Sequence, residues 1–212
     1  QKQPCLGITD SDRNTLIKSL SSALAVLGCK SRPGMERTPE RWADYLIEAC
    51  AVDEVKPTCF SEEFYSDSYG RTGQMIVQGP IPIYSICEHH ILPFYGHAWI
   101  GYIPSTEPTK ITKVYSRKVI GLSKLARIAV QCSKGFNTQE RITQRIAQTI
   151  AGLPDLEPVG VGVAVRCEHM CMACRGVGLT NVFTLTQELT GPFFDQAMTR
   201  SEFFNRVDSL KP

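Results

Sequence analysis

The chain of 212 residues contains no run of 18 or more apolar residues and no stretch with the apolar core of a secretory signal. Without such a run, a membrane-spanning helix is not expected. Neither sign of charge is in large excess, because 23 basic residues are balanced by 21 acidic ones, for a formal net charge of +2. A chain so close to neutrality gives no reason to expect nucleic acid or a membrane surface as a partner.

Histidine is scarce, and its placement is uneven. Only four histidines occur, and His89, His90 and His169 each lie within three residues of a cysteine. The number of cysteines is odd, which argues against a disulfide framework and favours a reducing, cytoplasmic location. The nine cysteines are Cys5, Cys29, Cys50, Cys59, Cys87, Cys132, Cys167, Cys171 and Cys174.

The composition is that of an ordinary globular protein, with 42% hydrophobic and 21% charged residues. A chain of this length forms one large domain, or one domain with a helical appendage. No internal repeat and no low-complexity tract interrupts it. Because the first residue is Gln1 rather than Met, we expect that an upstream segment was removed.

Hydrophobic periodicity predicts both helices and strands. Helices are predicted where leucine or isoleucine recurs every three to four residues, and strands where apolar residues alternate. The predicted helices are 11–28, 37–50, 119–132, 137–153 and 199–207, and the predicted strands are 74–84, 94–103, 159–167 and 179–189. We expect residues 53–72 to form a polar connection and residues 105–118 to form an exposed loop.

This order of elements favours an α+β fold with an antiparallel sheet. We expect an N-terminal helical segment over residues 1–72 and a second domain over residues 73–212. The last helix is expected to open with a capping box of Thr199 and Glu202.

Two short stretches concentrate side chains that bind metals. The first, "SICEHHILPFYGH" at 85–97, spaces Cys87 and His90 as C-x-x-H. The second, "RCEHMCMACRG" at 166–176, follows an alternating strand and offers Cys171 as a third ligand. A catalytic zinc site typically has three protein ligands and an open position for water. The neighbouring imidazoles, His89 and His169, are suited to move protons near neutral pH.

A closed structural site is the alternative to this open one. Cys174 follows Cys171 with C-x-x-C spacing, so Cys87, His90, Cys171 and Cys174 together would make a four-ligand zinc site without catalysis. The ligand pattern alone favours neither arrangement. Cys132 and Cys167 are interpreted as core thiols, and His97 as a strand residue.

Further motifs occur in a fixed order along the chain. They include "SICEHHILPFYG" (85–96), "VIGLSKLARI" (119–128), "QERITQRIA" (139–147) and "HMCMACRGV" (169–177). Each is weak by itself, but their ordered combination makes the sequence resemble the GTP cyclohydrolase I family over roughly residues 10–207. Members of this family hydrolyse GTP at C8 of guanine, release formate, rearrange the ribose and form 7,8-dihydroneopterin triphosphate.

The resemblance implies a fold, an assembly and a cofactor. The fold is the T-fold, an antiparallel sheet with helices on one side, preceded here by the N-terminal helical segment. Two stacked rings of five subunits are expected to form a homodecamer whose active sites lie at subunit interfaces; any regulatory protein partner is unknown. Zn²⁺ is the expected metal, with iron(II) and manganese as alternatives.

The resemblance also assigns roles to individual residues. Cys87, His90 and Cys171 match the zinc ligands, His89 and His169 match the proton-transfer histidines, and Ser123 matches a residue near the ribose. Lys124, Arg127 and Arg175 match triphosphate-binding residues, Gln139 and Glu140 match the guanine-reading pair, and Glu88 is given a supporting role.

Simpler interpretations of several of these residues remain open. Glu140 is three residues after Asn137 and would suit a helix capping pair, which the sequence alone favours. Lys124 and Arg127 would suit a solvated helix face. Cys174 and the long 105–118 segment depart from the family pattern. A zinc-stabilised, non-catalytic nucleotide-binding or regulatory paralogue is therefore the alternative to an enzyme.

Overall fold

The structure, a computed structural model, describes residues 7–29, 32–51, 58–65, 75–108, 110 and 114–210. The chain divides into two compact units, Gln1–Asp53 and Glu54–Pro212. The boundary expected between residues 72 and 73 falls outside the described residues and stays a prediction.

The N-terminal unit is a pair of helices, α1 (Asp10–Val26) and α2 (Thr38–Cys50). Thr9 begins α1 with a capping box, because its side chain accepts a hydrogen bond from the Asp12 amide while the Asp12 carboxylate accepts one from the Thr9 amide. Arg13 of α1 joins Asp44 of α2 through two hydrogen bonds of 2.7 and 3.0 Å. The expected N-terminal helical segment is therefore confirmed.

The second unit is built on a five-stranded sheet with the order β6-β2-β3-β7-β8. Its strands are β2 (Ile76–Cys87), β3 (Leu92–Ile103), β6 (Phe136–Asn137), β7 (Gly160–His169) and β8 (Phe183–Leu189). Every pairing is antiparallel except the short one between β2 and β6. The α+β fold with a mainly antiparallel sheet is confirmed.

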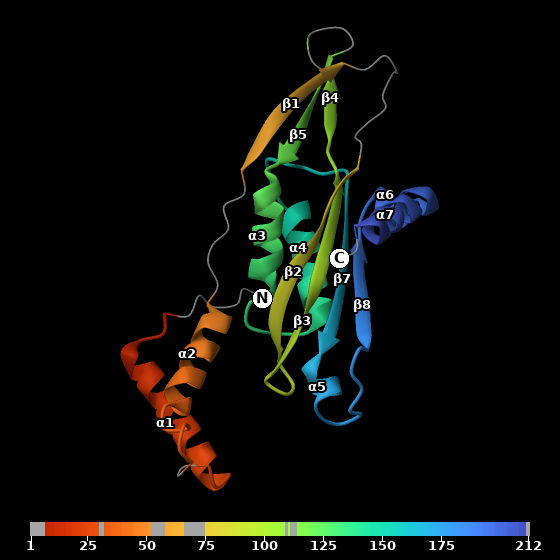
Figure 1. Cartoon of the computed structure of the whole chain (residues 1–212). Coiled ribbons are helices and arrows are strands. Elements are labelled where there is room, and N and C mark those ends of the chain that lie inside the picture. Colours follow the sequence, from red (N-terminus) through yellow and green to blue (C-terminus); the bar gives the residue numbers. More distant parts are fainter. Residues whose placement is uncertain are drawn as a thin grey trace. The chain divides into compact units, whose positions relative to one another are not determined.

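Two helices, α3 (Leu122–Ser133) and α4 (Gln139–Ala151), pack on one face of this sheet (Figure 1). Helix α3 lies against β2, whereas α4 lies against β8 and against β7, whose alternating valines point inward. The buried residues at this interface include Leu125, Ile128, Ile142, Ile146, Ile150, Val161, Val163 and Val165. This helix layer on one side of the sheet is the arrangement expected of the T-fold.

The C-terminal helices α6 (Pro192–Asp195) and α7 (Ala197–Ser209) pack on residues that point to the other face of the sheet. Glycine permits this close approach. A Cβ atom at Gly162 would lie 2.7 Å from the Phe193 ring, and one at Gly101 would lie 2.8 Å from the Phe203 ring. A helix layer thus covers part of the second face as well.

A second, three-stranded sheet has the order β1-β5-β4, and it corrects two expectations. The polar connection predicted at 53–72 contains β1 (Cys59–Tyr65), and the loop predicted at 105–118 contains β4 (Thr106–Pro108) and β5 (Val114–Ile120). β1 pairs with β5, from Cys59↔Ile120 to Tyr65↔Val114, so the paired residues are 49 to 61 positions apart in the chain. Local sequence carries little information about so distant a pairing partner.

The last helix also differs from the expectation. Helix α7 begins at Ala197 with Gln196 as its N-cap, so Thr199 lies inside the helix and the predicted capping box with Glu202 is wrong. The Thr199 hydroxyl instead donates to the side-chain oxygen of Gln196 at 3.1 Å. Glu202 pairs with Arg206 one turn later.

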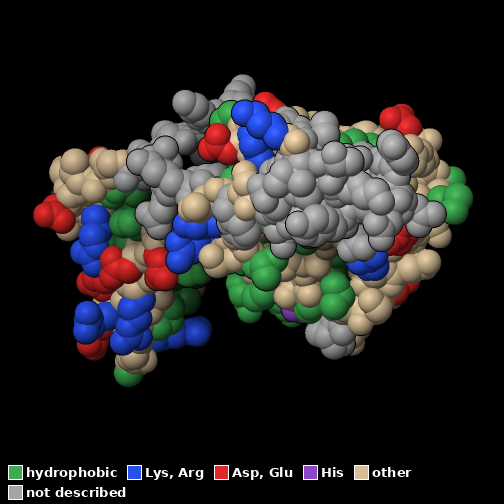
Figure 2. Space-filling view, turned by 90° about the horizontal axis from the view of Figure 1, so that it is seen from above, with side chains coloured by type: hydrophobic (Ala, Val, Ile, Leu, Met, Phe, Trp, Pro, Cys, Tyr) green, Lys and Arg blue, Asp and Glu red, His purple; other side chains and the backbone are tan. Residues whose placement is uncertain are grey.

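None of the described helices is long and apolar enough to cross a membrane. On the face of the molecule seen in Figure 2, basic and acidic side chains of the described residues are intermixed. This mixture matches the near balance of charges in the sequence.

The core between α4 and the sheet gives a direct test of this fold. We expect Ile146→Ala, which truncates a fully buried side chain, to lower the free energy of unfolding by about 2–5 kcal/mol. Gln144→Ala, on the exposed side of the same helix, is the matched control and should leave stability nearly unchanged. Urea unfolding measures both; equal effects would contradict the packing of α4 on the sheet.

Candidate metal centre and active site

The hairpin between β2 and β3 places the first two candidate ligands. Cys87 is the last residue of β2, and the chain turns back so that Cys87 pairs with Leu92. The Cys87 carbonyl accepts hydrogen bonds from the amides of His90 and Ile91, at 3.3 and 2.9 Å. This turn folds the C-x-x-H segment so that His90 Nδ1 lies 3.6 Å from Cys87 Sγ.

The third candidate ligand comes from the other side of β3. β7 pairs with β3 so that His169 is opposite Phe94, and the short helix α5 (Met170–Ala173) follows immediately. This brings Cys171 to the hairpin. Ligand atoms of Cys87, His90 and Cys171 lie within 4.8 Å of one another.

These three side chains fit a metal ion by both spacing and chemistry. With the usual zinc–sulfur and zinc–nitrogen bond lengths, a tetrahedral site separates a sulfur from a nitrogen ligand by about 3.6 Å. The Cys87–His90 separation has this value. Two thiolates and one imidazole form a donor set suited to a borderline-soft cation.

Cys174 does not join this group. Its thiol is exposed and donates a hydrogen bond to the Met170 carbonyl at 2.9 Å. Among the described residues, the group that includes Cys87 contains only three potential ligands. The structure therefore assembles the open three-ligand arrangement rather than the closed one.

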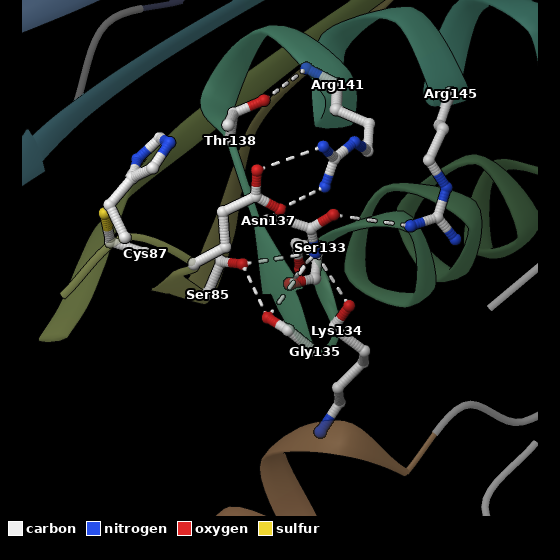
Figure 3. Close-up of polar contacts among 11 residues, drawn as sticks. Ser85, Cys87, Ser133, Lys134, Gly135, Asn137, Thr138, Arg141 and Arg145 are labelled. Atoms are coloured by element: carbon white, nitrogen blue, oxygen red, sulfur yellow. Dashed lines mark hydrogen bonds and ion pairs between the residues drawn. The ribbon is translucent and has the colours of Figure 1, made fainter. Parts of the chain in front are cut away.

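A buried asparagine holds the polypeptide beside Cys87 (Figure 3). The Asn137 side chain is fully buried, and its amide group donates to the carbonyls of Lys134 and Gly135 and to the Ser85 hydroxyl, at 2.8, 3.5 and 3.4 Å. The backbone carbonyl of Asn137 in turn accepts a hydrogen bond from the Glu88 backbone amide at 3.2 Å. The end of β2 is thus fixed against the segment that leads into α4.

Glu88 and Arg141 form a second link between the hairpin and α4. The guanidinium of Arg141 donates to both carboxylate oxygens of Glu88, one of them at 3.1 Å. This hydrogen bonding lowers the pKa of the Glu88 carboxyl. Sequence reasoning gave Glu88 a supporting role but missed its partner, which lies 53 residues away.

His169 lies at the end of β7 and is held on two sides. Its ring stacks on Phe94, with a centroid distance of 4.5 Å and an interplanar angle of 6°. Its Nε2 atom is 2.8 Å from Oε1 of Gln139. Burial lowers the pKa of His169, and the negative charge of Glu140 opposes this shift.

Glu140 lies in the first turn of α4 but does not take part in a capping box. Thr138, rather than Asn137, is the N-cap, and its side chain accepts a hydrogen bond from the Arg141 amide (Figure 3). The predicted pairing of Asn137 with Glu140 is therefore wrong, because Glu140 is one residue too early for that motif. Its exposed carboxylate remains available beside His169.

Two more expected residues lie close to the ligands. Nδ1 of His89 is 3.8 Å from Cys87 Sγ. Burial and then the nearby Cys87 thiol raise the pKa of Cys171, and the charge of Arg175 opposes the shift. Arg175 lies four residues after Cys171, directly past the C-cap of α5.

Three expected residues lie elsewhere in the chain. Ser123, Lys124 and Arg127 belong to the first half of α3, which begins next to the end of β5. Figure 1 shows this end of α3 just below β5, at the upper end of the five-stranded sheet, whereas the ends of β2 and β7 and helix α5 lie at its lower end. One chain therefore brings nine of the twelve expected site residues to one end of the sheet and leaves these three at the other end.

The remaining cysteines that were assigned to the core are buried as expected. Burial raises the pKa of Cys167 to about 12 and also raises that of Cys132. Both thiols lie in the main hydrophobic cluster.

The fold and the site together define a class: an α+β protein with a Cys-His-Cys metal-binding group at one end of its sheet. The sequence pattern described as GTP cyclohydrolase I matches residues 18–208. The chain therefore belongs to the GTP cyclohydrolase I family, whose members depend on a metal.

Similar proteins support this assignment. "GTP cyclohydrolase 1" of Dictyostelium discoideum is 37% identical over 204 residues, covering 93% of this chain and 79% of that protein. "GTP cyclohydrolase 1" of Sulfurihydrogenibium sp. is 36% identical over 201 residues, covering 94% and 97%. A solved apo structure of the archaeosine synthase QueF-Like covers 57% of this chain and 96% of that one, with 14% identity and a TM-score of 0.36, too weak a likeness to bear on function.

The two neighbouring cysteines of α5 allow a matched test of the metal group. We expect Cys171→Ala to lose stoichiometric zinc after dialysis, because it removes one of three protein ligands. Cys174→Ala should keep one zinc per chain. Elemental analysis of both variants checks this, and equal loss of zinc from Cys174→Ala would show a four-ligand site.

Proposed function

We propose that this protein hydrolyses GTP at C8 of guanine, releases formate, rearranges the ribose and forms 7,8-dihydroneopterin triphosphate. The observation that carries the proposal is the convergence of Cys87, His90 and Cys171 with two further histidines and Glu140, in a chain of the GTP cyclohydrolase I family. Similar proteins from two distant organisms carry the name of this activity.

Zinc is the metal we propose for the three-ligand group. Thiolate ligands favour zinc over manganese, which prefers oxygen donors. Zinc bound in a site with an open fourth position supplies a water of lowered pKa at neutral pH. The protein itself contributes the positions of Cys87, His90 and Cys171, which the hairpin and α5 fix independently of any ligand.

We assign proton transfer to the two histidines that are not ligands. C8 of a purine is a poor electrophile, and a proton at N7 makes it more reactive. His169 is suited to hold that proton, and His89 is suited to the later steps of ring opening and formate release. Ribose opening and rearrangement need further proton transfers, for which we propose Ser123.

Base recognition is assigned to Glu140. A carboxylate accepts hydrogen bonds from both N1–H and the 2-amino group of guanine, and adenine lacks this pair of donors. Glu140 is exposed at the start of α4 and close enough to His169 to affect its pKa. A base held by Glu140 would therefore lie beside the proposed proton-transfer group.

The triphosphate is assigned to Lys124, Arg127 and Arg175, since a triphosphate carries about four negative charges that cations neutralise. Arg175 lies just after α5, near Cys171, but Lys124 and Arg127 belong to the first half of α3, at the other end of the sheet. We therefore propose that α3 of a second subunit completes each site, in a homodecamer of two five-membered rings. A cytoplasmic location is proposed from the odd number of cysteines.

Incubation of the zinc-loaded protein with GTP tests the proposed reaction. We expect formate together with a pterin that fluoresces after oxidation, in equal amounts. Formate without pterin would mean that the reaction stops after ring opening. If neither product forms from a metal-loaded oligomer that binds GTP, the chain is the non-catalytic nucleotide-binding paralogue and the enzyme assignment is wrong.

Glu140→Gln tests base recognition separately. The amide replaces one acceptor oxygen with a donating NH₂ group, which would face one of the two guanine donors, so we expect kcat/KM for GTP to fall by about 100-fold or more. Preference for GTP over ITP, which lacks the 2-amino group, should also weaken. Glu202→Gln, which alters a surface ion pair of α7, is the control and should leave both values unchanged. Unchanged kinetics for Glu140→Gln would exclude the assigned role.

A further inference from the structure

Gln139, which the family resemblance pairs with Glu140 as a base reader, has its side chain buried in the protein. Only 2% of the residue is exposed. Its amide nitrogen is 2.8 Å from the Val165 carbonyl, 2.9 Å from the Thr184 carbonyl and 3.1 Å from the Thr186 hydroxyl. Its amide oxygen is 2.8 Å from Nε2 of His169. Gln139 thus joins the start of α4 to β7 and β8.

These partners fix which way the carboxamide points. The carbonyl oxygens of Val165 and Thr184 only accept hydrogen bonds, so the group facing them must be the donating NH₂. A flipped carboxamide would place its oxygen against two other oxygens.

A chain of hydroxyl groups requires the same orientation. The Thr143 hydroxyl donates to the backbone carbonyl of Gln139 at 2.8 Å, which uses its only proton. The contact of 2.6 Å between the Thr143 and Thr186 hydroxyls must then use the proton of Thr186. Thr186 is left as an acceptor for the Gln139 NH₂ group.

The orientation of the Gln139 carboxamide determines which ring nitrogen of His169 carries a proton. Because Oε1 of Gln139 can only accept, Nε2 of His169 must carry a proton. The neutral ring then has its lone pair on Nδ1, and stacking on Phe94 fixes the plane of the ring. A hydrogen bond to one imidazole nitrogen commonly sets the state of the other.

We propose that Gln139 is a positioning residue that holds His169 in the Nε2–H tautomer, so that Nδ1 is the atom that exchanges protons with the substrate. The tautomer follows from the hydrogen bonds alone, and only the role of Nδ1 in proton exchange rests on the proposed function. Gln139 thus has a role other than base reading, since both its oxygen and its NH₂ group are already engaged. Base reading is then left to Glu140, whose carboxylate is exposed.

Nitrogen NMR of the zinc-loaded protein tests the tautomer without any turnover. With ¹⁵N-labelled histidine, only four rings contribute, and subtraction of the His169→Ala spectrum isolates His169. At pH 8, where an ordinary histidine is neutral, we expect a protonated Nε2 and an unprotonated Nδ1. A protonated Nδ1 in the wild type would overturn the proposal. This measurement needs no Gln139 variant and so does not depend on the folding of one.

Kinetics of Gln139→Met test the positioning role. We expect kcat for formate release to fall about 10- to 100-fold, as for other residues that orient a functional histidine. KM for GTP and the preference for GTP over ITP should stay nearly unchanged. In the His169→Ala background the same substitution should have little further effect, because Gln139 acts through His169.

Two controls separate positioning from general stability. Gln144→Met changes an exposed glutamine of the same helix and should leave kcat unchanged. Thr186→Val removes one acceptor of the Gln139 NH₂ group but keeps the bond to His169, and should lower thermal stability far more than kcat.

Each other outcome has a distinct meaning. A raised KM with lost preference for GTP would show that Gln139 reads the base. An equal loss of kcat with and without His169 would show a purely structural role. Either result overturns the proposal. If the wild type releases no formate, the proposed function fails, and the tautomer of His169 still decides whether Gln139 positions it.

Discussion

The antiparallel pairing of β3 with β2 on one edge and with β7 on the other is the constraint on which the site depends. The β2–β3 register makes Cys87 the last strand residue before the turn that contains His90. The β3–β7 register sets His169 opposite Phe94, and Cys171 follows two residues later in the short helix α5. Three ligands from two distant parts of the chain meet because one strand pairs with both.

Polar side chains then join the elements at this end of the sheet, and two of them, Asn137 and Gln139, are buried whereas Arg141 is exposed. Asn137 fixes the segment that leads into α4, Arg141 ties that helix to Glu88, and Gln139 ties it to β7 and β8. All of these residues belong to one stretch of sequence around the start of α4. Because unpaired buried polar groups are costly, such a network favours a single arrangement of the site. The cations of α3, in contrast, lie at the other end of the sheet, which is why we propose that a second subunit supplies them to each site.

Features that depend on neighbouring residues could be predicted from the sequence, whereas features that depend on contacts between distant residues could not. The candidate ligands were found because C-x-x-H and the second cysteine cluster are short patterns, and α4 was found because Ile142, Ile146 and Ile150 repeat at helical spacing. β1 and β5 were missed because each pairs with a strand 49 to 61 residues away in the chain. The role of Gln139 was missed for a similar reason, since its partners lie on two later strands.

The central claim is that Cys87, His90 and Cys171 hold a metal and leave one position open to water. X-ray absorption spectroscopy at the zinc edge of the loaded protein tests this most directly. The account predicts two sulfur ligands at about 2.3 Å, one nitrogen at about 2.0 Å and one further light atom from solvent. Three sulfur ligands and one nitrogen, with no ligand from solvent, would show that Cys174 closes the site and would contradict the account.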